Sequence, residues 1–266
     1  MIYDSHIHSF FSADSDSSID DICNTAIKRN IDGITLTDHL DLYYPDFDVE
    51  FNIDFKKYHE EIAKYKKKYE DKLKIFAGLE LGYRTKAIEE SSQIVNAHNF
   101  DFVICSVHVI QGEDPYHGKY FEGKTKEEAY RIYLEKVYKS IVNQPDYDVI
   151  GHLGYIRRYG FVEDNSMNYS EYSDLLEPIL KKLISLGKGI ELNTSYFKRE
   201  PYIKMPEKDI LLKYKELGGE IITIGSDAHK PDRVGINFSE GIELLKECGF
   251  QYIAHFEQRK PIFTNI

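Results

Sequence analysis

The sequence predicts an α/β fold, in the form of a seven-stranded barrel of the TIM type. Short, nearly continuous apolar runs alternate with longer amphipathic runs along the whole chain. Each apolar run is followed by histidine or by a carboxylate or amide side chain. An open, doubly wound sheet is the alternative, but no GxGxxG motif follows the first run, which argues against its dinucleotide-binding version.

The apolar runs are rich in Ile, Val, Leu and Phe, as strands are when a parallel sheet buries both of their faces. We expect seven strands, at residues 1–6, 33–37, 74–79, 101–106, 148–151, 189–192 and 220–225. Nothing between them resembles a linker, a repeat or a low-complexity tract. We therefore expect one domain over residues 1–266.

Helices are expected between the strands. Ser17 and Ser18 stand three residues before Asp20 and Asp21, a capping pattern that opens a helix reaching about residue 29. Gly187 and Gly218 occupy positions where glycine commonly terminates a helix. The remaining helical runs are residues 56–72, 125–142, 172–186, 207–217 and 239–248.

The composition excludes some classes of partner. The chain has 34 Lys and Arg against 45 Asp and Glu, a formal charge of −11. Nucleic acids and anionic membranes bind clustered basic residues, so we expect neither as a partner. The N-terminus has no signal-peptide pattern, and three scattered cysteines form no disulfide framework, so we expect a cytoplasmic protein with buried thiols. The oligomeric state stays open.

Histidines gather where the predicted strands end. Six of the ten lie within about two residues of a strand end, and Glu80 and Asp227 share this placement. The carboxyl ends of barrel strands meet on one face, where such barrels hold their active sites. The six are His6, His8, His39, His108, His152 and His229. We therefore expect a metal centre on that face.

The spacing within two motifs supports this expectation. His6 and His8 project to the same side of an extended strand, as do Asp227 and His229. Imidazole with carboxylate suits zinc, iron or manganese. Because eight or nine candidate ligands are too many for one ion, we expect two or three divalent ions.

These motifs resemble the PHP (polymerase and histidinol phosphatase) superfamily. HIH, TDH, GLELG, SVH, GHLG and SDAH appear in the family's order across essentially the whole chain. GHLGYIRRYG, and ELNTS followed by Lys198 and Arg199, are most similar to the histidinol-phosphate phosphatase branch. The resemblance implies a distorted (β/α)7 barrel with a trinuclear metal centre.

The resemblance also implies how the ligands are shared among three ions. The first ion would take His6, His8, Glu80 and Asp227. Glu80 would bridge to a second ion, which His108 and His152 complete. The third would take His39, His229 and a residue of the loop after the first strand. Asp14 stands at that last position, where many family members have histidine, and the nearby Asp16 is the alternative.

Two arginines complete the predicted phosphate site. A guanidinium matches phosphate geometry, and the resemblance points to Arg158 and Arg199. Arg157 competes with the first and Lys198 with the second.

The expected activity is hydrolysis of L-histidinol phosphate to L-histidinol and phosphate, a step of histidine biosynthesis. Divalent ions neutralise the phosphate dianion and acidify a bridging water, whose hydroxide attacks phosphorus. Asp227 or His229 is the expected proton donor to the leaving oxygen. The cationic end of this small-molecule substrate needs an acidic wall, for which Glu113, Asp114 and Glu191 are candidates. The alternatives are a phosphatase for another phosphoester, such as a nucleotide or phosphotyrosine, and a non-catalytic domain that binds metal or phosphate.

Overall fold

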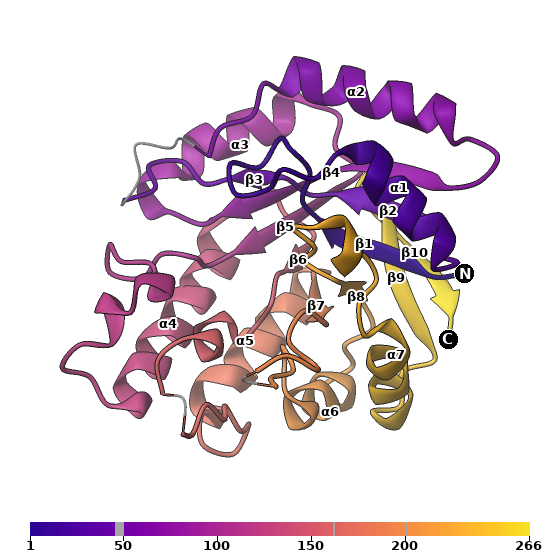
Figure 1. The fold of residues 1–266 in the computed structure, drawn as a ribbon. Coiled ribbons are helices and arrows are strands. Elements are labelled where there is room, and N and C mark those ends of the chain that lie inside the picture. Colours follow the sequence, from indigo (N-terminus) through magenta and orange to yellow (C-terminus); the bar gives the residue numbers. More distant parts are fainter. Residues whose placement is uncertain (46–50, 162, 201) are drawn as a thin grey trace.

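The computed structural model describes residues 1–45, 51–161, 163–200 and 202–266, and its centre is a parallel sheet curled into a barrel (Figure 1). All seven predicted strands are present, and they pair in chain order. They are β1 (Tyr3–Ile7), β2 (Gly33–Leu36), β4 (Lys74–Gly82), β5 (Phe102–Ser106), β6 (Val149–Ile150), β7 (Gly189–Asn193) and β8 (Ile222–Gly225).

The barrel is nearly closed, and the closing contacts lie beside the predicted site. Ile7 pairs in parallel with Ala228, just past the end of β8. The His8 amide donates to the Ala228 carbonyl at 2.9 Å, and the Asp227 amide donates to the His6 carbonyl at 2.8 Å. Closure therefore fixes the first and the last of the predicted metal-binding motifs against each other.

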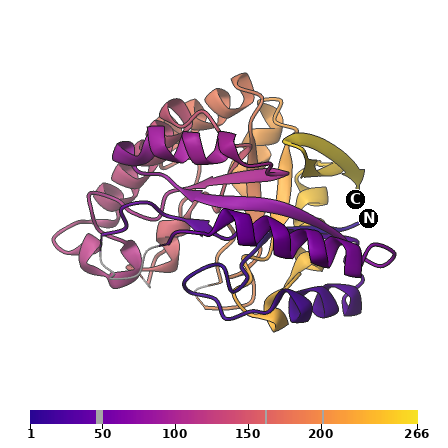
Figure 2. The ribbon, with the colours of Figure 1, turned by 90° about the horizontal axis from the view of Figure 1, so that it is seen from above.

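Helices surround the sheet, as the alternating pattern predicts (Figure 2). They are α1 (Ile19–Lys28), α2 (Phe55–Lys68), α3 (Ile88–Ala97), α4 (Lys126–Asn143), α5 (Ser173–Ser185), α6 (Lys208–Glu216) and α7 (Phe238–Glu247). The Ser18 side chain caps α1 by accepting from the Asp21 amide, and Thr125 and Glu128 form a capping box at α4. Gly187 and Gly218 follow α5 and α6 with positive φ, as predicted.

Apart from short 3₁₀ helices, three features of the described chain are additional to the sequence prediction: a helix, a short strand and a hairpin. Helix α3 has few apolar residues, and β3 (His39–Leu40) has only two residues, so neither has a clear periodicity. The third is an antiparallel hairpin of β9 (Tyr252–Glu257) and β10 (Lys260–Asn265).

The hairpin fills the end of the barrel that is remote from the predicted site. Ala254 and Phe256 of β9 pack with Phe102, Ile104 and Val149, which lie at or near the first residues of β5 and β6. Apolar side chains thus close the amino-terminal end of the strands, and the opposite end remains for polar side chains.

Cys23, Cys105 and Cys248 are buried free thiols. Within the described ranges, no helix is long and apolar enough to cross a membrane.

Candidate metal centre

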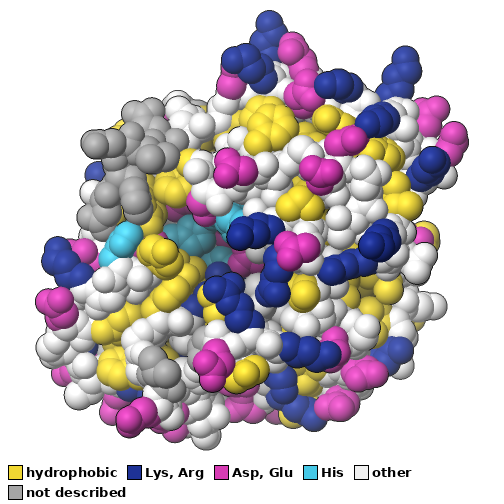
Figure 3. Space-filling view, viewed as in Figure 1, with side chains coloured by type: hydrophobic (Ala, Val, Ile, Leu, Met, Phe, Trp, Pro, Cys, Tyr) yellow, Lys and Arg dark blue, Asp and Glu magenta, His cyan; other side chains and the backbone are white. Residues whose placement is uncertain are grey.

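A cavity of about 390 Å³ opens at the carboxyl ends of the strands. Figure 3 shows histidine side chains in a hollow on this face, with Lys and Arg on its right and hydrophobic side chains on its left. The residues that line it include most of the predicted site and a group of aromatic side chains. They are Asp14, His39, Asp41, Tyr44, Phe51, Glu80, His108, Asp114, Tyr116, His152, Tyr155, Arg158, Tyr159, Asp227 and His229.

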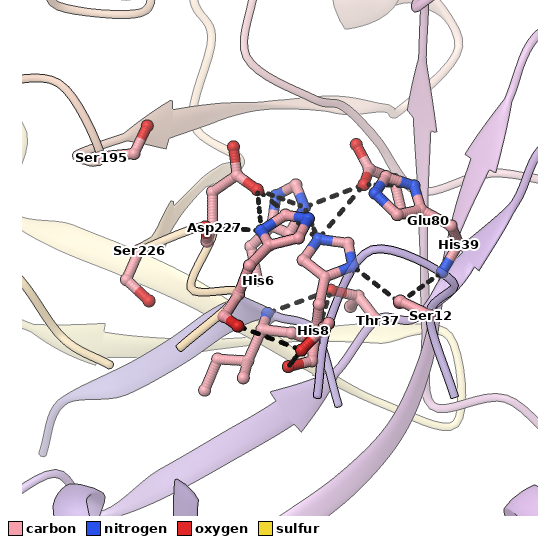
Figure 4. A network of polar contacts seen from close by, with 12 residues as sticks. His6, His8, Ser12, Thr37, His39, Glu80, Ser195, Ser226 and Asp227 are labelled. Atoms are coloured by element: carbon pink, nitrogen blue, oxygen red, sulfur yellow. Dashed lines mark hydrogen bonds and ion pairs between the residues drawn. The ribbon is translucent and has the colours of Figure 1, made fainter. Parts of the chain in front are cut away.

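One cluster of donor atoms joins β1 to β4 and to the loop after β8 (Figure 4). The Nε2 atoms of His6 and His8 lie 3.0 Å apart and 3.1 and 3.4 Å from Glu80 Oε2. Asp227 Oδ1 lies 3.6 and 3.5 Å from the same two nitrogens. Two buried imidazole nitrogens and two carboxylate oxygens at these separations form a donor set that fits a divalent cation.

The second cluster uses the other oxygen of Glu80. Glu80 Oε1 lies 2.8 Å from His152 Nε2 and 3.2 Å from His108 Nε2, and these two nitrogens are 3.4 Å apart. The Ser106 hydroxyl also donates to this oxygen, at 2.6 Å. Glu80 therefore faces a different donor set with each oxygen, as a carboxylate that bridges two cations does.

The third cluster lies nearer the solvent. Asp14 Oδ2 is 3.1 Å from His229 Nε2 and 3.6 Å from His39 Nε2. His8, His39 and His229 also have ligand atoms within 4.8 Å of one another. Both Asp14 and the alternative residue Asp16 are exposed, but of the two only Asp14 lines the cavity.

Local backbone structure explains why these side chains meet. Strand β4 continues three residues beyond the predicted end, and β3 pairs with it so that His39 stands opposite Glu80. Asp227 is not on an extended strand, contrary to the sequence argument, because β8 ends at Gly225 and Asp227 has a φ of 52°. His152 also has a positive φ, of 22°. Unfavourable backbone conformations of this kind cluster at functional sites.

Polar groups outside the donor clusters contact the Nδ1 atoms of three of the imidazoles. Glu191 Oε1 lies 2.6 Å from His6 Nδ1, Asp41 Oδ1 lies 3.0 Å from His108 Nδ1, and the Ser12 hydroxyl lies 3.1 Å from His8 Nδ1. A carboxylate that accepts from Nδ1 leaves the Nε2 lone pair facing the cluster, which is the tautomer that a metal needs. Sequence reasoning missed Asp41, although it is the second residue after the TDH motif.

The carboxylates at the centre are anionic. Burial raises the pKa of Glu80, but His6 and His39, which are protonated when no ion is bound, lower it more, and the result is well below the usual range. Burial likewise raises the pKa of Asp227, but Arg158 and His6 bring it well below the usual range. Both side chains therefore present negative charge to a cation at neutral pH.

The structure separates Arg158 from its competitor. Arg158 Nη2 lies 2.6 Å from Asp227 Oδ2 and 3.1 Å from the Ser195 hydroxyl, at the edge of the cavity. Arg157 instead donates to the Asn165 carbonyl at 2.6 Å and pairs with Glu207, away from the clusters.

Arg199 lies in a neighbouring depression. This depression shares Arg158, Asp227 and His229 with the central cavity. The guanidinium carbons of Arg158 and Arg199 lie 5.0 and 4.9 Å from the centroid of the Tyr196 ring. Lys198, the competitor of Arg199, forms an ion pair with Glu240.

The three acidic candidates for the substrate wall have different surroundings. Glu191 is fully buried, and it contacts His6 Nδ1 and accepts from the His152 amide at 2.6 Å. Its predicted contact with the substrate is therefore wrong, because both of its oxygens are directed at protein groups behind the donor clusters. Glu113 forms an ion pair with Lys119. Asp114 alone of the three lines the cavity.

Replacing Asp41 tests whether these outer contacts support a metal. Asp41→Asn removes the anion that holds His108 Nδ1, so we expect zinc affinity to fall about 10- to 100-fold. Competition with a chromogenic chelator measures this directly. Asp148→Asn is the control, since Asp148 is equally buried but pairs with Arg259 outside the centre. Equal zinc affinity in the Asp41 variant and the wild type would contradict the assigned role.

Comparison with known proteins agrees with this geometry. The family model described as the PHP domain matches residues 4–195. The histidinol-phosphatase of Lactococcus lactis is 36% identical over 258 residues, which are 97% of this chain and 95% of that protein.

Solved structures also resemble this chain. A crystal structure of histidinol phosphate phosphatase from Lactococcus lactis, in complex with zinc, L-histidinol and phosphate, superposes with a TM-score of 0.92 at 35% identity and covers 98% of each chain. Metal-dependent tyrosine phosphatases from Bacillus subtilis and Streptococcus pneumoniae share the fold, with a TM-score of 0.51 at 16% identity over 92% of this chain and 87% of theirs. On the family model and on this full-length similarity, the chain belongs to the PHP family.

Proposed function

We propose that this chain is a metal-dependent phosphomonoesterase that hydrolyses L-histidinol phosphate to L-histidinol and phosphate. One observation carries the proposal. The donor clusters around Glu80 lie in a barrel that resembles, over 98% of both chains, a structure bound to zinc, L-histidinol and phosphate. The whole chain acts as one domain in this proposal, because β8 and the residues after it complete both the sheet and the site. As an enzyme of histidine biosynthesis, it would work in the cytoplasm.

Three divalent ions fit the donor sets. Glu80 belongs to two of the sets. The first also contains His6, His8 and Asp227, and the second also contains His108 and His152. Asp14, His39 and His229 form the third. When bound, such ions would neutralise the phosphate dianion and lower the pKa of water. They would also stabilise the negative charge of the transition state more strongly than bulk water does. Zinc, iron and manganese all suit these ligands.

The arginines supply the rest of the phosphate site. Arg158 is held at the cavity edge by Asp227, Asn193 and Ser195, so its guanidinium is fixed before a substrate arrives. A positioned guanidinium can donate to two phosphate oxygens at once. Arg199 is exposed on the adjoining depression and is free to approach from the other side of Tyr196.

Asp227 and His229 are the groups we propose for proton transfer to the leaving oxygen. His229 Nε2 faces Asp14, so this nitrogen serves either as a ligand of the third site or as a carrier of a proton. When the third site is loaded, Asp227 is the group that remains; because it is an anion held by Arg158, it can accept a proton from the attacking water and pass it to the leaving oxygen. When the third site is empty, His229 Nε2 can carry a proton, since its contact with Asp14 raises its pKa although burial lowers it.

A substrate panel tests the proposed activity. We expect kcat/KM for L-histidinol phosphate to exceed that for p-nitrophenyl phosphate, a mononucleotide and phosphotyrosine, because the leaving group of the first can bind as well as its phosphate. Metal analysis accompanies each assay, and removal of metal by a chelator should abolish turnover, with recovery on adding zinc or manganese. A preference for the nucleotide or for phosphotyrosine would replace the proposal with another phosphatase activity. No turnover in metal-loaded protein would favour a non-catalytic role.

Asp14 and Asp16 form a matched pair for testing the third metal site. Asp14→Ala should reduce the bound metal by about one ion per chain, because it removes the carboxylate that faces both His39 and His229. Asp16→Ala should retain the full metal content. Metal-to-protein ratios from elemental analysis decide between the two, and the opposite result would assign the ligand to Asp16.

The arginines allow a similar pairwise test. Arg158→Ala and Arg199→Ala should each lower kcat/KM at least about tenfold, because each removes a charged hydrogen bond to phosphate, while metal content stays unchanged. Lys198→Ala is the control for Arg199, since Lys198 pairs with Glu240. Full activity in both arginine variants would remove these residues from the phosphate site.

A further inference from the structure

One tyrosine contacts both of the arginines that we propose for the phosphate site. The guanidinium carbons of Arg158 and Arg199 lie 5.0 and 4.9 Å from the centroid of the Tyr196 ring. All three residues line the depression beside the central cavity, which has a volume of about 540 Å³. A guanidinium at such a distance is attracted to the negative charge on the face of an aromatic ring. A single side chain therefore interacts with both cations.

The two arginines differ in what else holds them. Arg158 Nη2 lies 2.6 Å from Asp227 Oδ2 and 3.1 Å from the Ser195 hydroxyl, so its position is fixed. The side chain of Arg199 is exposed, and over the described parts of the chain no carboxylate forms an ion pair with it. An exposed arginine populates many rotamers, and ordering it when a ligand binds costs free energy. The Tyr196 ring is the group in contact with Arg199 that can reduce this cost.

The backbone around Tyr196 is anchored, so its ring can act as a fixed platform. Arg233 donates to the Ser195 carbonyl at 2.7 Å, and Phe197 packs against the hydrophobic core. The Arg199 amide donates to the Tyr196 carbonyl at 3.4 Å, in a turn that returns the chain toward the ring. The residues on both sides of Tyr196 are thus held by parts of the fold that do not belong to the metal centre.

An aromatic ring suits this position better than a carboxylate does. A carboxylate beside Arg199 would accept its hydrogen bonds and compete with phosphate, whereas a ring face attracts the cation and leaves its N–H groups free to donate. We infer that Tyr196 is a positioning residue of the phosphate site, whose ring keeps the guanidinium of Arg199 beside that of Arg158. The inference rests on the proposed function for the role of the two arginines, but it does not depend on which alcohol the ester carries.

The first experiment replaces the ring and measures phosphate binding in the metal-loaded protein. Tyr196→Phe keeps the ring and should leave the inhibition constant of inorganic phosphate unchanged. Tyr196→Leu should raise this constant, and KM for p-nitrophenyl phosphate, about three- to tenfold without loss of metal, because two cation–π contacts are removed. Tyr202→Leu is the control, since Tyr202 is exposed, follows Arg199 by three residues and has its ring over neither guanidinium. Equal effects of the two Tyr196 variants, or no effect of either, would overturn the inference.

The second experiment separates the charge of the ring from its shape. Phenylalanine at position 196 is compared with its mono-, di- and trifluorinated analogues, in which each fluorine withdraws negative charge from the ring face. The phosphate inhibition constant should rise stepwise along this series, from the value of Tyr196→Phe toward that of Tyr196→Leu. A constant value along the series would show that the ring only fills space, and Tyr196 would lose its positioning role.

The third experiment asks whether Tyr196 acts through Arg199. In an Arg199→Ala background, Tyr196→Leu should raise the phosphate inhibition constant by a smaller factor than in the wild type, because only the contact with Arg158 remains to be lost. The same factor in both backgrounds would contradict the inference, as would an Arg199→Ala variant that binds phosphate like the wild type. If the expected results hold while L-histidinol phosphate is a poor substrate, the role of Tyr196 stands and the proposed substrate falls.

Discussion

The arrangement of this site depends on one carboxylate that serves two donor sets. Glu80 lies on β4, near the middle of the sheet, and its two oxygens face different groups of imidazoles. Such a group is stable as a buried anion only when positive charge surrounds it on both sides. Histidines from β1, from β3 and from the loops after β5 and β6 must therefore surround Glu80 together. The barrel fold brings these distant parts of the chain within a few ångströms of one another.

That requirement explains several irregular features of the fold. The two residues of β3 pair with β4 and hold His39 opposite Glu80. The left-handed backbone at Asp227 turns its carboxylate back toward His6 and His8, and the barrel closes through hydrogen bonds of the same two segments. Glu191 and Asp41 then fix the rings of His6 and His108 from behind. His152 and Asp227 both have positive φ where donor atoms converge, while the opposite end of the barrel is closed by apolar packing of β9.

The sequence predicts the regular part of this structure well, because buried parallel strands and capped helices have strong local patterns. It also predicts which residue types face the cavity, since the carboxyl ends of all the strands meet there. It does not predict β3, the terminal hairpin or the support from Asp41, because each depends on contacts between distant segments. Glu191 illustrates the limit most clearly. The sequence offers it as a candidate for contact with the substrate, but it lies within β7, and only the structure places His6 and the His152 amide against its two oxygens.

The division of charge around the cavity bears on how such a site gains specificity. Donor sets for metal ions recognise what all phosphate monoesters share, so they cannot by themselves distinguish one alcohol from another. Discrimination between substrates must come from groups that contact the part that differs. In this chain the carboxylates at the donor sets face histidine or arginine, whereas Asp114 lies among neutral donors and aromatic rings. A protein with a formal charge of −11 thus places a buried carboxylate with neutral hydrogen-bond donors on the wall of its cavity, beside donor sets whose own carboxylates face histidine or arginine.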